Sequence, residues 1–306
     1  MHDKFGREIN SLRISVTQRC NLCCFYCHRE GQNSFEGEMS PAEIEKIVEI
    51  GGKLGIKKLK LTGGEPLMRE DICEIVQCTS DYMKETSMTT NGVLLDRYAG
   101  DLRDAGLRRV NISLDVLDAE RYKTITGRDC SQQVIRGVEA AIANDLTPVK
   151  LNVVVMKGVN DHEIEEMIHF AGESGTILQL IELETDGDCK TRALYEKYHC
   201  DFAPIEGRLE RDAIKVVERE LHRRRKYFIE NGSGVTEVEV VRPMHNTTFC
   251  ENCTRIRVTS DGKLKPCLLR NDNHVDIIGS IRGGASDEEL TEIFKKAILL
   301  REPFWR

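Results

Sequence analysis

The sequence predicts an α/β protein, an open partial (β/α)6 barrel of the TIM type with a C-terminal extension that closes the barrel. Between residues 12 and 181, short apolar strand patterns alternate six times with helical patterns. Such alternation is typical of a parallel sheet with right-handed crossovers. Six units are too few for a closed eight-stranded barrel, so the sheet should stay open and need a cover. The less regular remainder of the chain, from residue 186 onward, is expected to supply that cover.

The six expected strands share a short apolar or alternating run, and they cover residues 12–16, 59–62, 87–90, 110–114, 151–155 and 177–181. The helix after the first strand has the clearest boundaries. Ser40 and Glu43 can form a capping box around Pro41, and Gly55 ends the helical pattern. We therefore divide the chain into a barrel core, residues 1–185, and a C-terminal domain, residues 186–306.

Two elements are expected in the C-terminal domain. Residues 204–221 have the spacing of one amphipathic helix, and residues 235–241 alternate like a strand. A basic run from His222 to Lys226 follows the expected helix. Because cations suit the C-terminus of a helix, this run is expected to be a solvated helix end.

The composition is that of an ordinary globular chain. It has 306 residues, 40% of them hydrophobic, and a net charge of −7, which argues against broad nucleic-acid binding. No apolar stretch approaches the ~20 residues needed to cross a bilayer, and residues 1–4 lack the order of a signal peptide. We therefore expect a cytoplasmic protein without membrane contact. In that compartment its twelve cysteines should be metal ligands or buried thiols rather than disulfides.

Four cysteines, Cys20, Cys23, Cys24 and Cys27, lie within eight residues directly after the first expected strand. Cys20, Cys24 and Cys27 form a CxxxCxxC motif, whose three thiolates can hold three irons of a [4Fe–4S] cluster and leave the fourth iron open. All four cysteines together form two CxxC pairs, which suit a four-thiolate zinc site. A loop at the carboxyl end of a barrel strand is the usual place for a reactive centre.

A second group of cysteines lies near the C-terminus, where Cys250 and Cys253 form a CxxC pair and Cys267 follows. Three thiolates again fit a cluster with an open iron. A closed zinc site needs a fourth ligand, which His245 or His274 can supply.

Arg255 and Arg257 alternate directly after this CxxC pair, so they point the same way from an extended segment. They are either solvated or a clamp for phosphate, because a guanidinium group matches two phosphate oxygens at once. Lys60 and Lys150 lie within expected strands. They either face solvent or line an interior that binds a polyanion.

Small polar residues gather at the expected carboxyl ends of the strands, where barrels carry their functional groups. These residues are Thr62, Gly63, Gly64, Thr89, Thr90, Asn91, Ser113 and Asp115. Ser and Thr are also common turn residues, so a purely structural role stays open for each of them.

Two motifs in this order resemble the radical S-adenosylmethionine (SAM) superfamily: CxxxCxxC with Tyr26 before its last cysteine, and Thr62-Gly63-Gly64-Glu65-Pro66. The resemblance implies that Cys20, Cys24 and Cys27 hold a [4Fe–4S] cluster whose open iron binds the amino and carboxylate groups of SAM. It leaves Cys23 without a ligand role. It also implies an open six-stranded barrel as the radical SAM core.

The chain is also similar, along nearly its whole length, to the GTP 3′,8-cyclases of molybdenum cofactor biosynthesis. The similarity rests on residues 12–17, 61–67, 89–92, 111–115 and 250–257. It implies that Tyr26, Gly64 and Ser113 contact SAM. It further implies a second [4Fe–4S] cluster whose open iron holds the guanine of GTP, on Cys250, Cys253 and Cys267. The other GTP contacts that it implies are Arg13, Lys60, Thr89, Lys150, Arg255 and Arg257.

The implied reaction begins with reductive cleavage of SAM into methionine and a 5′-deoxyadenosyl radical. That radical takes the 3′ hydrogen of GTP, and the carbon radical attacks C8 of guanine to give (8S)-3′,8-cyclo-7,8-dihydroguanosine 5′-triphosphate. The implied partners are GTP, an electron donor and the downstream cyclic pyranopterin monophosphate synthase. A homodimer is a further expectation.

Two positions depart from the family pattern. The family often ends in a Gly-Gly tail implicated in catalysis, whereas this chain ends in residues 301–306, and its Gly283-Gly284 pair is internal. Glu184 stands where a Met often follows the sixth strand. The remaining cysteines have no assigned role: Cys73, Cys78, Cys130, Cys189 and Cys200.

Two other functions compete with the cyclase. The first is a radical SAM enzyme with an auxiliary cluster that acts on a peptide, in which the Arg-x-Arg pair has no role. The second is a zinc-organised interaction protein without catalysis. Colour after anaerobic purification separates this second alternative, because iron–sulfur clusters are brown and zinc sites are colourless.

Overall fold

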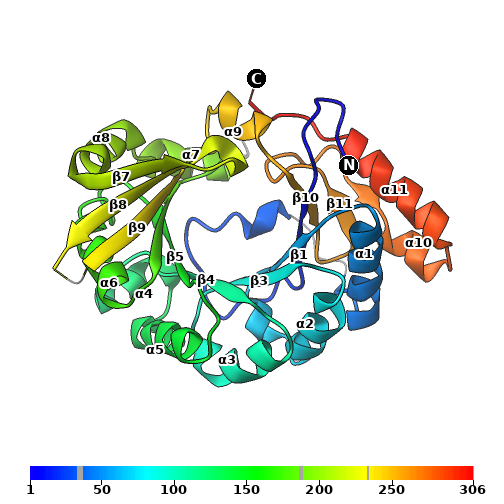
Figure 1. Ribbon diagram of the computed structural model, residues 1–306, viewed down its shortest axis with the longest axis horizontal. Coiled ribbons are helices and arrows are strands. Elements are labelled where there is room, and N and C mark those ends of the chain that lie inside the picture. Colours follow the sequence, from blue (N-terminus) through cyan, green and yellow to red (C-terminus); the bar gives the residue numbers. More distant parts are fainter. Residues whose placement is uncertain (33–36, 186–188, 233, 306) are drawn as a thin grey trace.

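The computed structural model describes residues 1–32, 37–185, 189–232 and 234–305. Its centre is one twelve-stranded sheet with the strand order β12-β11-β10-β1-β2-β3-β4-β5-β6-β9-β8-β7. In Figure 1 this sheet curves into an open barrel, with helices α1 to α6 around its outside. No helix in the described ranges is long and apolar enough to cross a membrane.

The strands of this sheet are β1 (Ser11–Ser15), β2 (Lys58–Thr62), β3 (Glu85–Thr90), β4 (Arg109–Ser113), β5 (Lys150–Val155), β6 (Ile177–Glu182), β7 (Ala213–Glu218), β8 (Arg225–Asn231), β9 (Gly234–Val241), β10 (Arg255–Val258), β11 (Lys263–Lys265) and β12 (Val275–Asp276). The helices are α1 (Pro41–Lys53), α2 (Ile72–Ser80), α3 (Leu95–Asp104), α4 (Ala119–Thr126), α5 (Ser131–Ala143), α6 (Ile164–Glu173), α7 (Cys189–Tyr198), α8 (Phe202–Asp212), α9 (Thr247–Glu251), α10 (Ile278–Arg282) and α11 (Asp287–Leu299). Short 3-10 turns cover Arg29–Gly31, Pro66–Met68 and Leu221–Arg223.

The predicted α/β core is confirmed, because β1 to β6 are neighbouring parallel strands in chain order. The capping box before α1 is present as expected. The Ser40 N–H donates to Glu43 Oε2 at 2.8 Å, and the Glu43 N–H donates to Ser40 Oγ at 3.3 Å. These two bonds satisfy amide groups that the first turn of a helix leaves free.

The C-terminal part lengthens the sheet at both ends. β10 pairs in parallel with β1, and β9 pairs in parallel with β6. Antiparallel strands follow on each side, β11 and β12 beyond β10 and β8 and β7 beyond β9. In the described chain the outermost strands do not pair with each other, so the sheet is not closed. The expectation that the extension closes the barrel is therefore wrong. Added strands instead satisfy the free backbone groups at both edges of the six-stranded core.

The helix expected over residues 204–221 is also wrong beyond its first half. α8 ends at Asp212, and the chain continues as the edge strand β7. Ile214, Val216 and Val217 are β-branched and favour a strand, although their spacing also fits a helix. β7 pairs antiparallel with β8, while the side chains of Ile214 and Val216 stay exposed.

Alternation along the parallel strands separates an apolar outer face from a polar interior. On β1, Leu12 and Ile14 are fully buried, and Arg13 between them points to the other face. The cross-strand neighbours of Arg13 are Arg257 on β10 and Lys60 on β2. The interior of the barrel therefore receives charged side chains, while the apolar side chains pack under the helices.

Candidate active site

The first cysteine loop leaves β1 at the carboxyl end of the sheet and is held from two sides. The Cys23 N–H donates to the carbonyl of Thr126, the last residue of α4, at 2.8 Å. From the other side, Asn91 Nδ2 donates to Asn21 Oδ1 at 2.7 Å. The loop is therefore fixed between the end of α4 and the turn that follows β3.

The three thiols of the CxxxCxxC motif share one environment. Burial raises the pKa of Cys24, and Asp115, Cys27 and Cys20 raise it further, so this thiol lies within electrostatic range of the other two. The Sγ atoms of Cys20 and Cys27 each accept a backbone N–H from two residues further along, at 3.4 Å. Such N–H···S bonds favour a thiolate, so this donor set fits the ligands of an iron–sulfur cluster.

The Gly63-Gly64 turn at the end of β2 is shaped by close contact with the segment before the cysteines. A Cβ on Gly63 would lie 2.5 Å from the carbonyl oxygen of Thr17, and a Cβ on Gly64 would lie 2.3 Å from that of Arg19. The Gly64 N–H also donates to the Thr17 carbonyl at 2.7 Å. Both glycines are therefore needed for this approach, whatever contact Gly64 makes with a ligand.

Glu65, the next residue of this turn, is fully buried and has a role that the sequence patterns did not predict. Its carboxylate accepts hydrogen bonds from Thr90 Oγ1 at 2.7 Å, from the Asn91 N–H at 2.6 Å and from the Leu67 N–H at 3.0 Å. Burial raises the pKa of Glu65 to about 7. Because Asn91 also holds Asn21, Glu65 connects the ends of β2 and β3 to the cysteine loop.

Tyr26 lies against Asp115 in the same region. The Tyr26 hydroxyl donates to Asp115 Oδ2 at 2.6 Å, and Asp115 Oδ1 accepts the Val154 N–H at 2.9 Å. Burial raises the pKa of Asp115 to about 6. Ser113 ends β4 two residues earlier, so it lies at the same end of the sheet. Asp115 therefore positions the tyrosine, and the SAM contacts of Tyr26, Gly64 and Ser113 stay a prediction.

The two ends of the chain frame the second cysteine loop. Arg7 Nη1 donates to the Cys250 carbonyl at 2.9 Å, and Arg301 Nη2 donates to the Cys253 carbonyl at 2.7 Å. Both arginines also pair with the buried Asp3, at 2.7 and 2.6 Å. An ion-paired frame of this kind fixes the path of the loop and places positive charge beside it.

Positive charge reaches the thiols themselves. Burial alone would raise the pKa of Cys253, but the guanidinium groups of Arg301, Arg255 and Arg257 outweigh burial and lower it. Burial raises the pKa of Cys267, and the neighbouring Cys253 raises it further. Three cysteines in an electropositive setting fit a site in which thiolates bind iron.

The described residues contain no group of three or more His, Cys, Asp or Glu side chains arranged to hold a single metal ion. The thiolates of a cluster bind different irons, so they need not converge on one point. Of the two histidines considered for zinc, His245 stacks on Trp305 with ring centroids 4.1 Å apart. The Nε2 atom of His274 is buried and has no hydrogen-bond partner among the described residues.

A row of basic side chains lies on the face of the sheet that lines the inside of the barrel. Arg257 on β10, Arg13 on β1 and Lys60 on β2 are consecutive cross-strand neighbours. Thr89 on β3 and Lys150 on β5 are both neighbours of one residue of β4, Asn111. Arg255 lies two residues before Arg257 on the same strand. The structure therefore places the residues predicted to bind GTP on one continuous surface inside the barrel.

These cations are incompletely neutralised. One carboxylate, Glu30, serves two of them, at 2.8 Å from Arg257 Nη1 and 3.7 Å from Arg13 Nη1. Lys60 Nζ donates to the neutral Asn111 Oδ1 at 2.7 Å. Burial, helped by Arg257, lowers the pKa of Arg13 to about 9, and burial lowers the pKa of Lys60 well below its usual value. The interior therefore holds excess positive charge, which a polyanionic ligand would offset.

Several residues of this interior were missed by the sequence patterns, namely Glu30, Arg109, His222, Arg224 and Glu239. His222 and Arg224 belong to the basic run that was expected to be solvated, and that expectation is wrong, because they are only 3% and 7% exposed. Their neighbours Arg223 and Arg225 are exposed. Residues 221–223 form a 3-10 turn, with His222 and Arg223 in the left-handed region, and no sequence signal in this uniformly basic run separates the buried side chains from the exposed ones.

The two departures from the family pattern lie near the second site. Glu184 is half-buried, and burial raises its pKa although Arg257 and Arg13 oppose that shift. It therefore adds a carboxyl group beside the arginines. At the C-terminus, Trp305 contacts His245, while Gly283 and Gly284 lie in the turn after α10.

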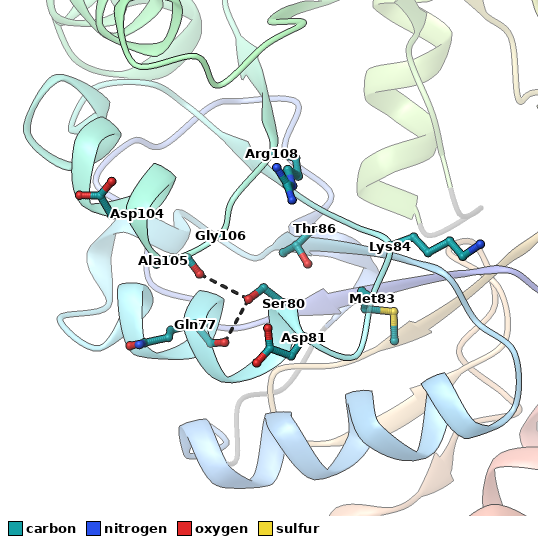
Figure 2. Close-up of a pocket in the computed structure, with 10 residues that line it drawn as sticks. All are labelled: Gln77, Ser80, Asp81, Met83, Lys84, Thr86, Asp104, Ala105, Gly106 and Arg108. Atoms are coloured by element: carbon teal, nitrogen blue, oxygen red, sulfur yellow. Dashed lines mark hydrogen bonds between the residues drawn. The ribbon is translucent and has the colours of Figure 1, made fainter.

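A groove of about 360 Å³ lies at the opposite end of the sheet, beside the C-terminal ends of α2 and α3 (Figure 2). It is lined by Gln77, Ser80, Asp81, Met83, Lys84, Thr86, Asp104, Ala105, Gly106 and Arg108. Ser80 Oγ contacts two carbonyls there, that of Gln77 at 3.1 Å and that of Ala105 at 3.5 Å. Because parallel barrels carry their chemistry at the carboxyl ends of the strands, this groove is not part of the candidate site.

Comparison with known proteins agrees with this geometry. Residues 14–171 match the family model of the radical SAM superfamily, and residues 176–306 match that of Molybdenum Cofactor Synthesis C. The fold resembles the crystal structure of SuiB from Streptococcus suis bound to S-adenosylmethionine, with a TM-score of 0.64 and 16% identity over 89% of this chain and 64% of that chain. At this identity the likeness supports the fold alone.

Two curated relatives cover the whole chain. A probable GTP 3′,8-cyclase of Thermococcus kodakarensis is 54% identical over 100% of both chains. A probable GTP 3′,8-cyclase of Methanothermobacter marburgensis is 49% identical over 100% of this chain and 99% of its own length. The chain therefore belongs to the radical SAM superfamily and, within it, to the GTP 3′,8-cyclase family.

Proposed function

We propose that this protein converts GTP to (8S)-3′,8-cyclo-7,8-dihydroguanosine 5′-triphosphate in molybdenum cofactor biosynthesis. The observation that carries the proposal is the row of basic side chains inside the barrel, together with membership of the GTP 3′,8-cyclase family. Nearby groups neutralise Arg13, Lys60 and Arg257 only in part. The negative charge of a triphosphate would offset the remaining positive charge. A peptide substrate would leave most of that charge unmatched.

The two cysteine sets are the proposed cofactor sites. Cys20, Cys24 and Cys27 would hold a [4Fe–4S] cluster, beside which Tyr26, Gly64 and Ser113 would contact SAM. Cys250, Cys253 and Cys267 would hold a second [4Fe–4S] cluster. When bound, the first cluster and SAM supply the radical that removes hydrogen from C3′ of GTP.

The chain's own contribution is to position GTP and to exclude water. Arg13, Lys60, Thr89, Lys150, Arg255 and Arg257 would bind the nucleotide. Guanidinium groups suit this task because they match phosphate oxygens through two parallel hydrogen bonds. Held away from the reacting carbons, the triphosphate fixes the ribose by contacts that do not take part in the chemistry.

The partners and the cellular setting are part of the same proposal. All twelve cysteines are free thiols in the structure, which suits a reducing cytoplasm. The reaction needs an electron donor, and its product would pass to cyclic pyranopterin monophosphate synthase. We further propose that the barrel core and the C-terminal domain meet near residue 185 and that the chain forms a homodimer.

Isotope transfer tests the proposed reaction directly. GTP carrying deuterium at C3′ is incubated with the anaerobically reconstituted protein, SAM and a reductant, and 5′-deoxyadenosine is analysed by mass spectrometry. The proposal predicts deuterium in 5′-deoxyadenosine and formation of the cyclised nucleotide. Transfer from another ribose position, or from no position, would overturn the cyclase function. GTP labelled at C2′ is the matched control.

A further inference from the structure

The loop that joins β7 to β8, residues 219–224, reaches into the barrel although its sequence is strongly basic. The Arg219 N–H donates to the Arg224 carbonyl at 2.8 Å and closes the loop. His222 and Arg224 are buried, whereas the side chain of Arg223 is 53% exposed. Two side chains of the basic run from His222 to Lys226 are therefore buried, and both are polar.

This loop spans the gap between the two edges of the parallel sheet. The His222 N–H donates to the carbonyl of Asn252, between Cys250 and Cys253, at 3.2 Å. The His222 ring stacks on Phe249 with centroids 3.7 Å apart. The loop thus continues from the β9 side of the barrel to the second cysteine set beside β10.

Charge is unbalanced where the loop meets the sheet. The fully buried carboxylate of Glu239 lies 2.6 Å from Lys150 Nζ, 2.8 Å from Arg219 Nη1 and 3.8 Å from Arg224 Nη1. Gln179 Nε2 also donates to Glu239 at 2.6 Å, so both carboxylate oxygens are engaged. A fourth cation, Lys226, lies 3.5 Å from Glu239 but pairs with Glu237 at 2.5 Å. Among the described residues, Glu239 therefore faces Lys150, Arg219 and Arg224 with one negative charge, and two positive charges are in excess.

Polar atoms of the loop also lack partners. Both ring nitrogens of His222 and the Nε atom of Arg224 are buried without a hydrogen bond within the described protein. The Nε atom of Arg13 is in the same condition. Buried donors are usually satisfied, and leaving one unsatisfied costs about 1–3 kcal/mol. Unsatisfied donors beside uncompensated cations indicate an anionic ligand with several acceptor oxygens.

We propose that residues 219–224 form a substrate-binding loop in which Arg224 binds the terminal phosphates of GTP together with Lys150. This inference rests on the proposed cyclase function and adds residues to the same site. Glu239 acts as an internal counterion that holds the cations while the site is empty. The single phosphate of GMP is the one nearest the ribose, whereas a triphosphate extends to the terminal phosphates that would meet Arg224 and Lys150.

Nucleotide binding without turnover tests the loop. The anaerobic holoprotein is prepared without SAM or reductant, and dissociation constants for GTP and GMP are measured by equilibrium dialysis. A charge-assisted hydrogen bond is worth about 1.5–3 kcal/mol, so Arg224→Gln should weaken GTP binding by roughly 10- to 150-fold. Binding of GMP should weaken by less than about threefold, because its single phosphate lies outside the reach of Arg224.

Two variants serve as controls. Arg225→Gln removes an adjacent but exposed arginine outside the loop, whose partner is Glu210 at 3.4 Å, and should leave GTP binding unchanged. Arg224→Lys keeps the charge and should recover part of the affinity. Normal GTP binding by Arg224→Gln, or equal losses for GTP and GMP, would overturn the loop's role. If the unaltered protein binds no GTP, the proposed function itself fails, so the two failures are distinguishable.

Glu239→Gln provides a second test if Arg224→Gln does not fold. Removing the internal counterion leaves the cations to repel one another, so this variant should melt at a lower temperature than the unaltered protein. GTP should then raise its melting temperature by more than it raises that of the unaltered protein. An equal or smaller shift with GTP would show that Glu239 does not compete with phosphate and would contradict the proposal.

Discussion

The two cysteine sets have the same number of proposed ligands, but Cys24 in the first and Cys253 in the second have neighbours of opposite charge. At Cys24 of the first set, burial raises the pKa of the thiol, and Asp115 and Cys27 raise it further. Beside the second set lie guanidinium groups, which lower the pKa of Cys253 against the effect of burial. The two thiols therefore have neighbours of opposite charge, although Arg29 lies near Cys27 of the first set and the pKa of Cys267 in the second set is raised.

This difference indicates that the two cysteine sets serve different ligands. An anionic substrate is favoured beside the second set, where Arg255 and Arg257 lie on β10 directly after the CxxC pair. It is disfavoured beside the first set, where further negative charge would meet Asp115. The first set is therefore suited to SAM, whose sulfonium carries positive charge, and the second set to GTP.

The largest expected effect comes from removing a thiol of the first set. Cys24→Ala should abolish SAM cleavage and lower the iron content by about half, because one of two four-iron sites is lost. Cys23→Ala, its neighbour in sequence, should keep both the iron content and the cleavage. Iron analysis and chromatography of 5′-deoxyadenosine measure these outcomes. Cleavage by Cys24→Ala together with its loss in Cys23→Ala would reverse the ligand assignment.

A smaller effect is expected from the arginines of the second site. Arg257→Ala should weaken GTP binding by roughly 10- to 150-fold, because it removes a charge-assisted hydrogen bond worth about 1.5–3 kcal/mol. SAM cleavage should continue. Arg282→Ala removes an exposed arginine that pairs with Glu43 at 2.7 Å and should bind GTP normally. Equal GTP affinity in the Arg257→Ala and Arg282→Ala variants would contradict a role of the arginines beside the second cysteine set in binding GTP.

The smallest expected effect is a pH dependence of GTP binding that comes from Lys150. Burial, with Arg219 and Arg224, lowers its pKa to about 8 despite the opposite effect of Glu239. Phosphate binds the charged form, so affinity should fall as the pH rises through this pKa. With one titrating proton the loss is about threefold between about pH 7.5 and 8.5.

Lys150→Arg is the control for this titration, because arginine stays charged throughout that range. Its GTP affinity should change by less than about 1.5-fold over the same interval, apart from any change shared with the unaltered protein. Fluorescence or dialysis titrations at each pH provide the measurement. A pH dependence that persists unchanged in Lys150→Arg would show that another group carries it.

The regular part of the chain was predictable because its signals are local. The capping box at Ser40 and the apolar runs of β1 to β6 depend on near neighbours in sequence, and the structure confirms both. The edge strand β7 was not predictable in this way. Ile214 and Val216 fit a helix and a strand equally well by spacing, and pairing with β8 decides between the two.

The polar contacts of the interior could be predicted only in part. The cysteines and Arg257 could be identified from the sequence, because they belong to motifs of fixed spacing that resemble those of the family. Glu239 and Arg224 belong to no such motif. Their ion pair joins strand β9 to the loop between β7 and β8. The frame around Cys253 joins Asp3 to Arg301 from opposite ends of the chain, a proximity that local sequence patterns do not encode.

The division of work between the two sites is tested most directly by replacing Cys250, Cys253 and Cys267 together with Ala. Reconstituted variant and unaltered protein are incubated with SAM, GTP and reductant, and 5′-deoxyadenosine and cyclised nucleotide are measured side by side. We expect the variant to cleave SAM slowly and to form no cyclised nucleotide. Formation of cyclised nucleotide by this variant, or complete loss of SAM cleavage with the first site's iron intact, would contradict the account.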